Sequence, residues 1–346
     1  MSAATLLIRA DASTAIGTGH VMRCLALAQA WQDTGGRVVF AMAETTGAIT
    51  ARLLGESCEV TSLRVVAGSG DDARQTASFA AQHNWPWVVV DGYRFDAEYQ
   101  RRLKAAGLRI LFLDDYGHAE HYAADVVLNH NLCAEDALYA HREPYTRLLL
   151  GARYCLLRRE FSSWRNWKRE IPEAASKLLV TIGGSDPDNV TSLVVQALEQ
   201  VHVANLDAVI VIGGSNPHKE SVEEAAGRSR NQVRVVTDAA NMAELMAWAD
   251  IAISGAGSTV WEICALGLPA ILICVAENQR ASAEFLATKI SLRLFDAGSG
   301  MKTTDIAAAI EDLASQASLR ERICRDARQL VDCNGAERVV AEIIGN

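Results

Sequence analysis

The sequence predicts an α/β protein built from two Rossmann-like domains, and three observations carry this prediction. Short apolar runs alternate with longer runs of helical periodicity, which is the order of parallel strands joined by crossover helices. The apolar runs are hydrophobic at successive positions, as expected of strands buried on both faces of a sheet. The 346 residues also exceed the ~100–200 residues of a usual single domain. We therefore expect two open parallel sheets.

The expected strands follow in order along the chain. In the first half the apolar runs are residues 5–10, 37–43, 87–93, 109–116 and 124–130. In the second half they are residues 177–184, 206–214, 232–238, 249–257 and 269–275. Each half begins with a strand, a glycine-containing loop and a helix, at residues 5–31 and 177–200. Near the chain end, residues 318–344 have helical periodicity that is broken at "CNG" (333–335).

The two halves define the expected domains. The first domain is expected at residues 1–155 and the second at residues 177–346, with the last helix able to pack on the first domain. Residues 156–176 link them, because this stretch is rich in Arg and Trp, lacks a strand pattern and ends in a polar turn with proline. Two such domains facing each other would form a cleft at the carboxyl ends of their strands, where we expect the active site.

The amino-acid composition limits the classes of molecule that the protein is expected to bind. A formal charge of −9 gives no electrostatic reason to expect nucleic acid or an anionic membrane. No apolar run approaches the ~20 residues that span a bilayer, and residues 1–13 lack the charged start and long apolar core of a signal peptide. The eight cysteines are scattered without a C-x-x-C pair, which favours buried thiols in a reducing compartment. We expect a cytoplasmic monomer that binds a small molecule.

The stretch 249–279 is the most informative part of the second half. Gly255 and Gly257 allow close approach of the backbone, and Ser258 and Thr259 can cap a helix that runs to about residue 266. The start of such a helix suits a phosphate or diphosphate. Glu262 comes three residues after Thr259, so it is either the partner in a capping box or a carboxylate that accepts hydrogen bonds from ribose hydroxyls.

Two further loops of the second half follow strands. Residues 183–191 are either a phosphate-binding loop, in which Asp186 or Asp188 caps the next helix, or an ordinary turn between a strand and a helix. "ENQ" at 277–279 offers amides at a strand end, or is a plain loop without chemistry. No G-x-x-x-x-G-K-[ST] and no intact N-terminal G-x-G-x-x-G occurs, which disfavours an ATPase or a dehydrogenase.

His20 stands where the loop "IGTG" gives way to a helix that begins near Val21. The positive end of the helix dipole disfavours a charged imidazolium, so a histidine here is expected to be neutral and able to accept a proton. The alternative is a histidine that merely caps the helix. Asp11, at the end of the first strand, could orient the His20 ring, bind sugar hydroxyls or form the turn.

Polar residues also follow the later strands of the first half. Tyr93, Asp115 and Asn131 are expected to project into the same cleft, where such side chains are typical of sugar recognition, although loops also carry them for solubility. Asp114, Asp115, His118 and His121 together suggest a metal site. Against that interpretation, no remote set of ligands completes a coordination sphere. We therefore expect no bound metal.

With these residues assembled, the chain resembles the hydrolases of the pseudaminic acid pathway that remove UDP from UDP-2,4-diacetamido-2,4,6-trideoxy-β-L-altropyranose. The resemblance covers nearly the whole chain. It rests on "RADASTAIGTGHVMRCLALA", "VVVDGY", "LDDY", "VLNHN", "YCLLRREF", "IGGSDPDN" and "SGAGSTVWEICALGLPAILICVAENQ" in this order. The second half is also similar to the nucleotide-binding half of the GlcNAc transferase of peptidoglycan synthesis, which has the glycosyltransferase B architecture.

The resemblance implies a function and a set of residues. It implies hydrolysis without metal or cofactor, in which water attacks the anomeric carbon with inversion and His20 is the general base. It assigns the diphosphate to Ser258, Thr259 and the Gly257 backbone, the ribose to Glu262, and a phosphate or sugar edge to Asn278. The residues expected to bind substrate or nucleotide are Asp11, Gly17, Gly19, Arg23, Tyr93, Asp115, Asn131, Gly184, Ser185, Asn189, Gly257, Ser258, Thr259, Glu262, Asn278 and Gln279.

Two other functions remain compatible with the sequence. A glycosyltransferase of the same fold would pass the sugar to an acceptor instead of water, and a lipid acceptor would call for an exposed apolar or basic patch near the first domain. A sugar-nucleotide sensor would bind without turnover. Release of UDP without an acceptor distinguishes the hydrolase from both.

Overall fold

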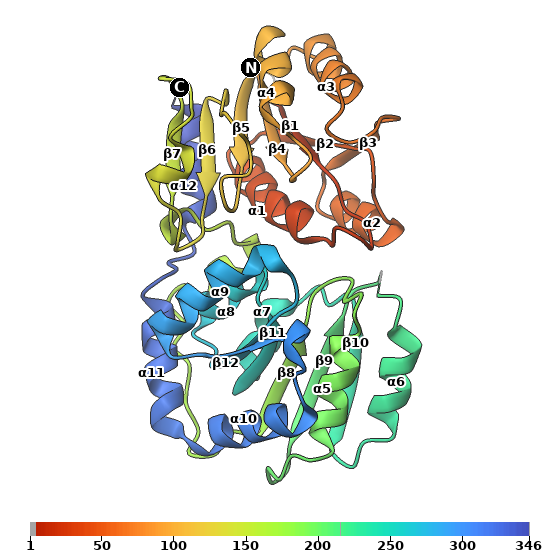
Figure 1. Cartoon of the computed structure of the whole chain (residues 1–346), viewed down its shortest axis with the longest axis vertical. Coiled ribbons are helices and arrows are strands. Elements are labelled where there is room, and N and C mark those ends of the chain that lie inside the picture. Colours follow the sequence, from red (N-terminus) through yellow and green to blue (C-terminus); the bar gives the residue numbers. More distant parts are fainter. Residues whose placement is uncertain (1–4, 215, 346) are drawn as a thin grey trace. The chain divides into compact units, whose positions relative to one another are not determined.

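A computed structural model describes residues 5–214 and 216–345. Its internal contacts divide the chain into two compact units. Unit 1 holds the residues up to Arg159 together with those from Cys333 onward, and unit 2 holds Glu160–Asp332. Each unit is a parallel sheet with helices (Figure 1). The predicted α/β class with two Rossmann-like domains is therefore confirmed.

Unit 1 is built on a sheet that has seven strands within the described residues, every pairing of neighbours being parallel. In spatial order they are β3 (Glu59–Ser62), β2 (Arg37–Met42), β1 (Thr5–Ala10), β4 (Trp87–Asp91), β5 (Arg109–Leu113), β6 (Val126–Asn129) and β7 (Arg147–Leu150). The chain order reverses between β1 and β4, so the loops that follow these two strands open side by side.

Helices cover both faces of this sheet, which explains why its strands are apolar at successive positions. Leu6 and Ile8 of β1 belong to one core, and Leu7 between them belongs to the other. The first core is covered by α1 (Gly19–Asp33), α2 (Gly47–Gly55) and α12 (Gly335–Ile344), and the second by α3 (Gly70–Gln82) and α4 (Ala97–Ala105). Short 3-10 turns lie at η1 (Asp136–Tyr139) and η2 (Ala152–Tyr154).

Unit 2 repeats the design with a sheet of six strands in its described residues. In spatial order they are β10 (Gln232–Thr237), β9 (Asp207–Ile212), β8 (Lys177–Thr181), β11 (Ile251–Gly255), β12 (Ala270–Cys274) and β13 (Arg293–Asp296). Its helices are η3 (Arg159–Trp164), α5 (Val190–Leu198), α6 (Lys219–Gly227), α7 (Met242–Trp248), α8 (Thr259–Leu266), α9 (Glu277–Ile290), η4 (Ala297–Ser299), α10 (Thr303–Ser315) and α11 (Ala317–Arg328). The switch in chain order falls between β8 and β11.

The ten expected strands are all present, and three further strands were missed. The missed strands β3, β7 and β13 each stand at the edge of a sheet and have only four residues. β3 reads "EVTS" and β13 reads "RLFD", with no fully buried residue in either. An edge strand needs no continuous apolar run, so the signal used for the central strands is absent in β3 and β13, whereas β7 has a run of only three leucines.

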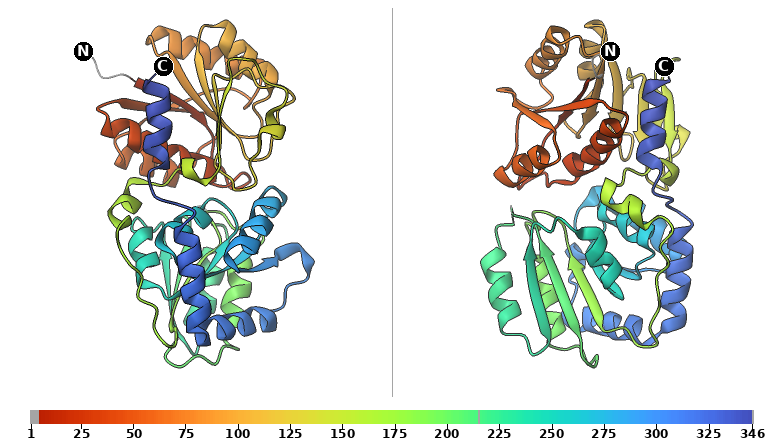
Figure 2. Two further views of the ribbon diagram at one scale, coloured as in Figure 1. Left: turned by 90° about the vertical axis from the view of Figure 1, so that its left-hand side faces the viewer. Right: turned by 180° about the vertical axis from the view of Figure 1, so that it is seen from behind.

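The predicted break near the chain end is confirmed. α11 ends at Arg328 and α12 begins at Gly335, with Cys333 between them in a left-handed conformation (φ 60°). α12 packs on α1 in unit 1, as Figure 2 shows. Gly335 is required there, because a Cβ atom would collide with the backbone of Cys155.

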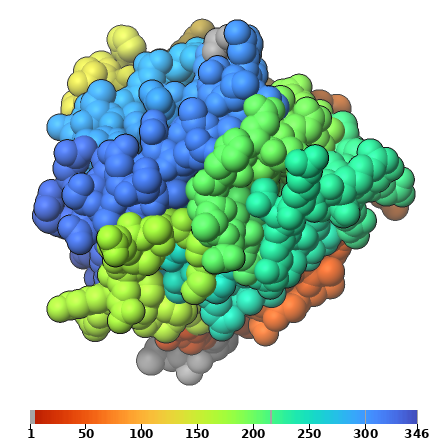
Figure 3. All heavy atoms as spheres, turned by 90° about the horizontal axis from the view of Figure 1, so that it is seen from below, coloured from red at the N-terminus to blue at the C-terminus, as the bar shows by residue number. Residues whose placement is uncertain are grey.

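The segment that links the two sheets, residues 156–176, is called the connecting segment. Its part in unit 2 runs along the surface beside α11 (Figure 3). Arg320 of α11 is fully buried and holds this segment without a carboxylate partner in the described residues. Its guanidinium donates to the carbonyls of Leu313 and Ala314 at the end of α10, and to those of Pro172 and Glu173 in the connecting segment.

Replacing Arg320 by Met is expected to lower the free energy of unfolding by about 3 kcal/mol, because buried carbonyls lose a charged donor. Urea unfolding measures the change. Arg322→Met is the matched control, since Arg322 lies on the same helix and is exposed. Equal effects of the two substitutions would contradict the role given to Arg320.

Candidate functional site

The loop after β1 leads directly into α1 and places His20 in its first turn. α1 begins at Gly19, two residues earlier than expected, and its N-cap is Thr18, whose side chain makes no capping hydrogen bond. The alternative that His20 merely caps the helix is therefore wrong. Gly17 allows the preceding turn, since its φ of 76° lies in the left-handed region and its N–H donates to the Ser13 carbonyl.

His20 forms a hydrogen-bonded pair with a carboxylate. Its Nδ1 lies 2.7 Å from Oδ1 of Asp91, the last residue of β4. An Arg23 nitrogen lies 3.2 Å from the same Nδ1, but the carboxylate oxygen is the nearer partner and is an acceptor. Nδ1 therefore carries the hydrogen, and the neutral ring presents the lone pair of Nε2. The exposed fraction of the His20 side chain is 12%, whereas Asp91 is fully buried. The pair therefore has one buried carboxylate behind a histidine that can accept a proton.

Arg23, one turn further along α1, joins this pair to a second carboxylate. Its guanidinium donates to both carboxylate oxygens of Asp91, with both N···O distances 2.6 Å, and to Oδ1 of Asp115, also at 2.6 Å. Such a fork fixes the plane of the Asp91 carboxylate. The orientation of the His20 ring is thus set by a carboxylate that is itself held rigidly.

The charges of this cluster leave one net negative charge beside His20. Burial alone would raise the pKa of Asp91, but the Arg23 charge and the hydrogen bonds lower it to about 2. The pKa of Asp115 is also lowered, since Arg23 outweighs burial there too. Two carboxylates therefore face one guanidinium.

Further predicted residues complete the cluster. The Tyr93 hydroxyl donates to Oδ2 of Asp115 at 2.6 Å, and the Tyr93 ring meets the His20 ring edge to face with centroids 4.8 Å apart. The Asn131 amide donates to Asp115 at 3.2 Å. The structure thus brings together His20, Arg23, Tyr93, Asp115 and Asn131, which come from four separate segments of the sequence.

His130, beside Asn131, is buried within the same unit. Burial and the positive charge of Arg23 lower the pKa of His130 to about 4, although Asp115 and Asp91 act in the opposite direction. His130 is therefore neutral at pH 7. The sequence reasoning passed over this residue.

Asp11 does not orient the His20 ring, which corrects one of the alternatives considered for it. Its carboxylate accepts hydrogen bonds from the backbone N–H groups of Ala43 and Glu44 and pairs with Arg9 at 2.7 Å. Asp91 takes the orienting role instead. Asp11 joins the end of β1 to the loop after β2.

The four residues of the suggested metal site do not converge on one point, although His118 lies within hydrogen-bond distance of Asp114. Asp114 accepts hydrogen bonds from the three backbone N–H groups that follow it, Asp115 pairs with Arg23, and His121 pairs with Glu143. Across the described residues, no group of three or more His, Cys, Asp or Glu side chains is placed to hold a metal ion. The metal alternative has no geometric basis in these four residues.

In unit 2 the backbone of the loop after β11 lies close to the backbone after β8, as its glycines suggested. A Cβ on Gly255 would collide with the Ile182 carbonyl. The N-cap of α8 is Ser258, and its side chain makes no capping hydrogen bond. Glu262 is then the fourth residue of the helix rather than the third, so the capping-box alternative is wrong. Thr259 does not cap the helix but is its first residue.

The residues 277–279 form the first turn of α9 rather than the loop considered for them. The N-cap residue of α9 is Ala276, whose side chain has no acceptor for the first N–H groups of the helix. The Gln279 amide lies beside the α8 start, since a Cβ on Gly257 would come within 3.3 Å of its Nε2. Two helix starts without a side-chain cap therefore lie next to each other, and both carry residues predicted to bind nucleotide, with Asn278 on the second.

The start of α5 differs, because a carboxylate already occupies it. Asp186 accepts hydrogen bonds from the backbone N–H groups of Val190 and Thr191 at 2.9 and 2.8 Å. The prediction that Asp186 or Asp188 caps this helix is confirmed for Asp186. Asn189 accepts a hydrogen bond from Ser192, and Ser185 is buried. The Gly184 carbonyl abuts Gly213. This loop offers less room for an anion than the starts of α8 and α9.

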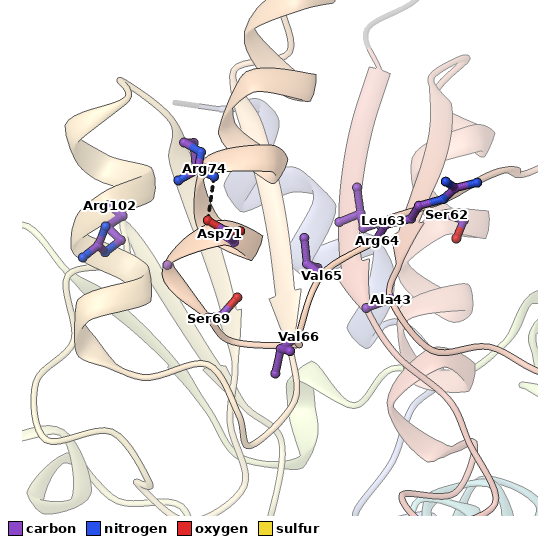
Figure 4. Close-up of a pocket in the computed structure, with 11 residues that line it drawn as sticks. Ala43, Ser62, Leu63, Arg64, Val65, Val66, Ser69, Asp71, Arg74 and Arg102 are labelled. Atoms are coloured by element: carbon purple, nitrogen blue, oxygen red, sulfur yellow. Dashed lines mark ion pairs between the residues drawn. The ribbon is translucent and has the colours of Figure 1, made fainter.

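A groove of unit 1 lies apart from the predicted residues, none of which lines it. It has a cavity volume of about 980 Å³ and runs between the loop after β3 and the start of α3 (Figure 4). At its edge Arg74 pairs with Asp71 of the same helix, and Arg102 pairs with Glu98. The groove therefore has mixed charge and indicates no particular ligand.

Known proteins can now be compared with this chain. Residues 178–329 match the glycosyltransferase family 28 C-terminal domain. MurG of Acinetobacter baumannii superposes with a TM-score of 0.65 at 18% identity, covering 99% of this chain and 100% of MurG. The Anabaena protein Alr3699/HepE, solved in complex with UDP and glucose, gives a TM-score of 0.61 at 15% identity and covers 99% of each chain. The chain has the glycosyltransferase B fold.

The resemblance drawn from the sequence is matched by a relative whose name states the same activity. The UDP-2,4-diacetamido-2,4,6-trideoxy-beta-L-altropyranose hydrolase of Campylobacter jejuni is 26% identical over 82% of this chain and 96% of its own length. The resemblance to these hydrolases is therefore confirmed over most of this chain. Among the described residues, no helix combines the length and the apolar character needed to cross a membrane.

Proposed function

We propose that this protein hydrolyses a UDP-linked 2,4-diacetamido-2,4,6-trideoxy sugar, of the β-L-altropyranose form, to the free sugar and UDP in the cytoplasm. The observation that carries the proposal is the hydrogen bond between His20 and Asp91. This bond leaves Nε2 of His20 as a proton acceptor in unit 1. The similarity to the Campylobacter jejuni hydrolase supports the choice of substrate.

The proposed reaction needs one base and one leaving group. A water oxygen attacks the anomeric carbon while the bond between that carbon and the UDP oxygen breaks, and its electron pair leaves with UDP. The water gives its proton to Nε2 of His20, and the configuration of the anomeric carbon inverts. A nucleoside diphosphate leaves as an anion without prior protonation, so no second carboxylic acid is needed. Asp91 stabilises the imidazolium as it forms.

In this proposal unit 2 binds the UDP group. The uncapped starts of α8 and α9 suit the diphosphate, because backbone N–H groups and the helix dipole favour an anion there. Ser258 and Thr259 supply hydroxyls at the same place, and we assign the ribose hydroxyls to Glu262. Neutralisation of the diphosphate by helix starts explains why we propose a reaction without metal.

The test is release of UDP from the purified full chain. UDP-linked diacetamido sugars of several configurations are supplied without an acceptor and in the presence of EDTA. We expect UDP and free sugar, fastest with the altropyranose form, and ¹⁸O from labelled water in the sugar. Label in the UDP phosphate would refute attack at carbon. Turnover that requires an added acceptor would favour the glycosyltransferase alternative, which the fold equally accommodates.

Binding of UDP is expected to slow amide hydrogen exchange at the starts of α8 and α9, in residues 256–262 and 276–280. The start of α5, residues 189–192, is expected to change little, because Asp186 already occupies its N–H groups. Exchange followed by mass spectrometry, with and without saturating UDP, measures both. Protection centred on 189–192 instead would contradict the assignment of the diphosphate to α8 and α9.

A further inference from the structure

His118 of unit 1 lies in the loop after β5 and faces a hydrogen-bond acceptor on each side, one in its own loop and one in the loop after β4. Its Nδ1 is 3.2 Å from Oδ1 of Asp114, and its Nε2 is 3.1 Å from the carbonyl oxygen of Phe95. The side chain is 9% exposed. A carbonyl oxygen cannot donate, and an ionised carboxylate cannot either. Both ring nitrogens of His118 therefore need a hydrogen, which makes the ring an imidazolium.

Asp114 is ionised in this arrangement. Burial alone would raise its pKa, but the hydrogen bond and charge of His118 and the further donors lower it. Its Oδ1 accepts hydrogen bonds from the backbone N–H groups of Asp115, Tyr116 and Gly117, and its Oδ2 accepts one from the Tyr122 hydroxyl. Burial alone would also lower the pKa of His118, but Asp114 raises it. An ionised Asp114 and a protonated His118, which the hydrogen bonds require, are thus also the forms that these pKa shifts favour.

The two hydrogen bonds of His118 connect the loops that carry the predicted site. Phe95 belongs to the loop after β4, which also holds Tyr93, and Asp114 begins the turn after β5, which holds Asp115. The Tyr93 ring contacts the His118 ring edge to face, with centroids 5.7 Å apart, and contacts the His20 ring at 4.8 Å. His118 thus supports the residues that surround His20 without bonding to His20 itself.

We propose that His118, as an imidazolium, is a positioning residue that clips the loops after β4 and β5 together and so holds Tyr93 and Asp115 against His20 and Arg23. Loss of its proton breaks one of its two hydrogen bonds and loosens both loops. Turnover is then lost as the pH rises through the titration of His118. The part about turnover rests on the proposed function, whereas the charge of His118 does not.

The charged and titratable groups around His118 favour its protonated form. Asp114 and Asp115 contribute negative charge, and Tyr93 and Tyr116 contact the ring, while Tyr122 reaches it only through Asp114. Burial and the two carboxylates raise the pKa of Tyr116, and burial and Asp114 raise that of Tyr122, so both hydroxyls stay protonated. Because the pKa of His118 is raised, its contribution is complete below the ordinary value of 6.5 and is lost above the raised value.

The first experiment follows the ring nitrogens of the histidines by ¹⁵N NMR in the ligand-free full chain. We expect one histidine that is protonated on both nitrogens at pH 7, and His118→Gln should remove its signals. His121→Gln is the matched control, since His121 lies in the same segment, is 30% exposed and pairs with Glu143. A His118 ring that carries only one hydrogen at pH 7 would overturn the proposal, whether or not the protein hydrolyses a sugar nucleotide.

The second experiment compares pH profiles of turnover. We expect His118→Gln to lower kcat roughly 10- to 100-fold, because one of two charge-assisted hydrogen bonds is lost. His118→Lys keeps a charged donor, so it should retain turnover at alkaline pH where the wild type loses it. His121→Gln should match the wild type. An alkaline loss that is the same in His118→Lys and the wild type would refute the positioning role, and absence of any turnover would refute the proposed function alone.

Discussion

Replacing His20 by Asn is expected to slow turnover roughly 10²–10⁴-fold, the usual contribution of a general base. Asn keeps polarity and similar size, and its amide can still donate to Asp91, but it has no nitrogen that accepts a proton from water. Binding of UDP should stay nearly unchanged, because the helix starts that we assign to the diphosphate belong to unit 2.

Steady-state kinetics and calorimetric titration with UDP measure the two quantities on the same preparation. His83→Asn is the control, since His83 is exposed at the end of α3, where its ring hydrogen-bonds to the Phe79 carbonyl and stacks on Trp85. If binding falls as much as turnover does, His20 acts in ground-state binding or in structure and is not the base. A catalytic role also requires that the control retain full turnover.

The fold could be predicted from the sequence because its central strands are buried on both faces. Leu6, Leu7 and Ile8 are all fully buried although they alternate between two cores, so the strand appears as one continuous apolar run. Parallel strands also bring their carboxyl ends to one edge. For this reason His20, Tyr93 and Asp115 could be expected together, each from the loop after a different strand.

Asp91 could not be found by the same reasoning, although it is central to the cluster. It is the last residue of an apolar strand and lies 71 positions from His20 in the sequence. Its proximity depends on the order of the strands, since β4 is the neighbour of β1 and Asp91 pairs with Ala10. A buried carboxylate that ends an otherwise apolar run was the available signal, because such a group requires a charged partner.

The capping of helices was predicted with mixed success, because a shift of one residue changes the outcome. Asp186 caps α5, as its position before the helix suggested. In α8 the helix begins one residue earlier than a capping box at Thr259 requires, and Glu262 loses that role. Sequence spacing does not fix a helix start to one residue.

Replacing Asp91 by Asn is expected to lower turnover roughly 10²–10⁴-fold through His20, although Asp91 touches no substrate in the proposal. Oδ1 of Asp91 accepts from both His20 and Arg23, and Oδ2 accepts from Arg23 again. An amide can supply only one oxygen. If its NH₂ group faces His20, the ring must carry its hydrogen on Nε2 and can no longer act as a base.

Either orientation of the amide also costs stability. Its NH₂ group faces an N–H donor of Arg23 in both, because Arg23 donates to each carboxylate oxygen of Asp91 inside a buried cluster. We therefore expect Asp91→Asn to lower the free energy of unfolding by about 2–4 kcal/mol as well, measured by urea unfolding. Asp71→Asn is the surface control, because Asp71 is 61% exposed and pairs with an exposed arginine.

A double-mutant cycle separates the two effects of Asp91. If Asp91 acts on turnover through His20, adding Asp91→Asn to His20→Asn should cost little further turnover, because the base is already absent. The loss of stability should remain in the double variant, since it arises at Arg23. Independent, multiplying losses of turnover would show that Asp91 acts on the reaction by a route other than His20. Since the pKa of Asp91 is held near 2 by Arg23 against the effect of burial, the cycle can be run at any pH above about 4 with the carboxylate ionised.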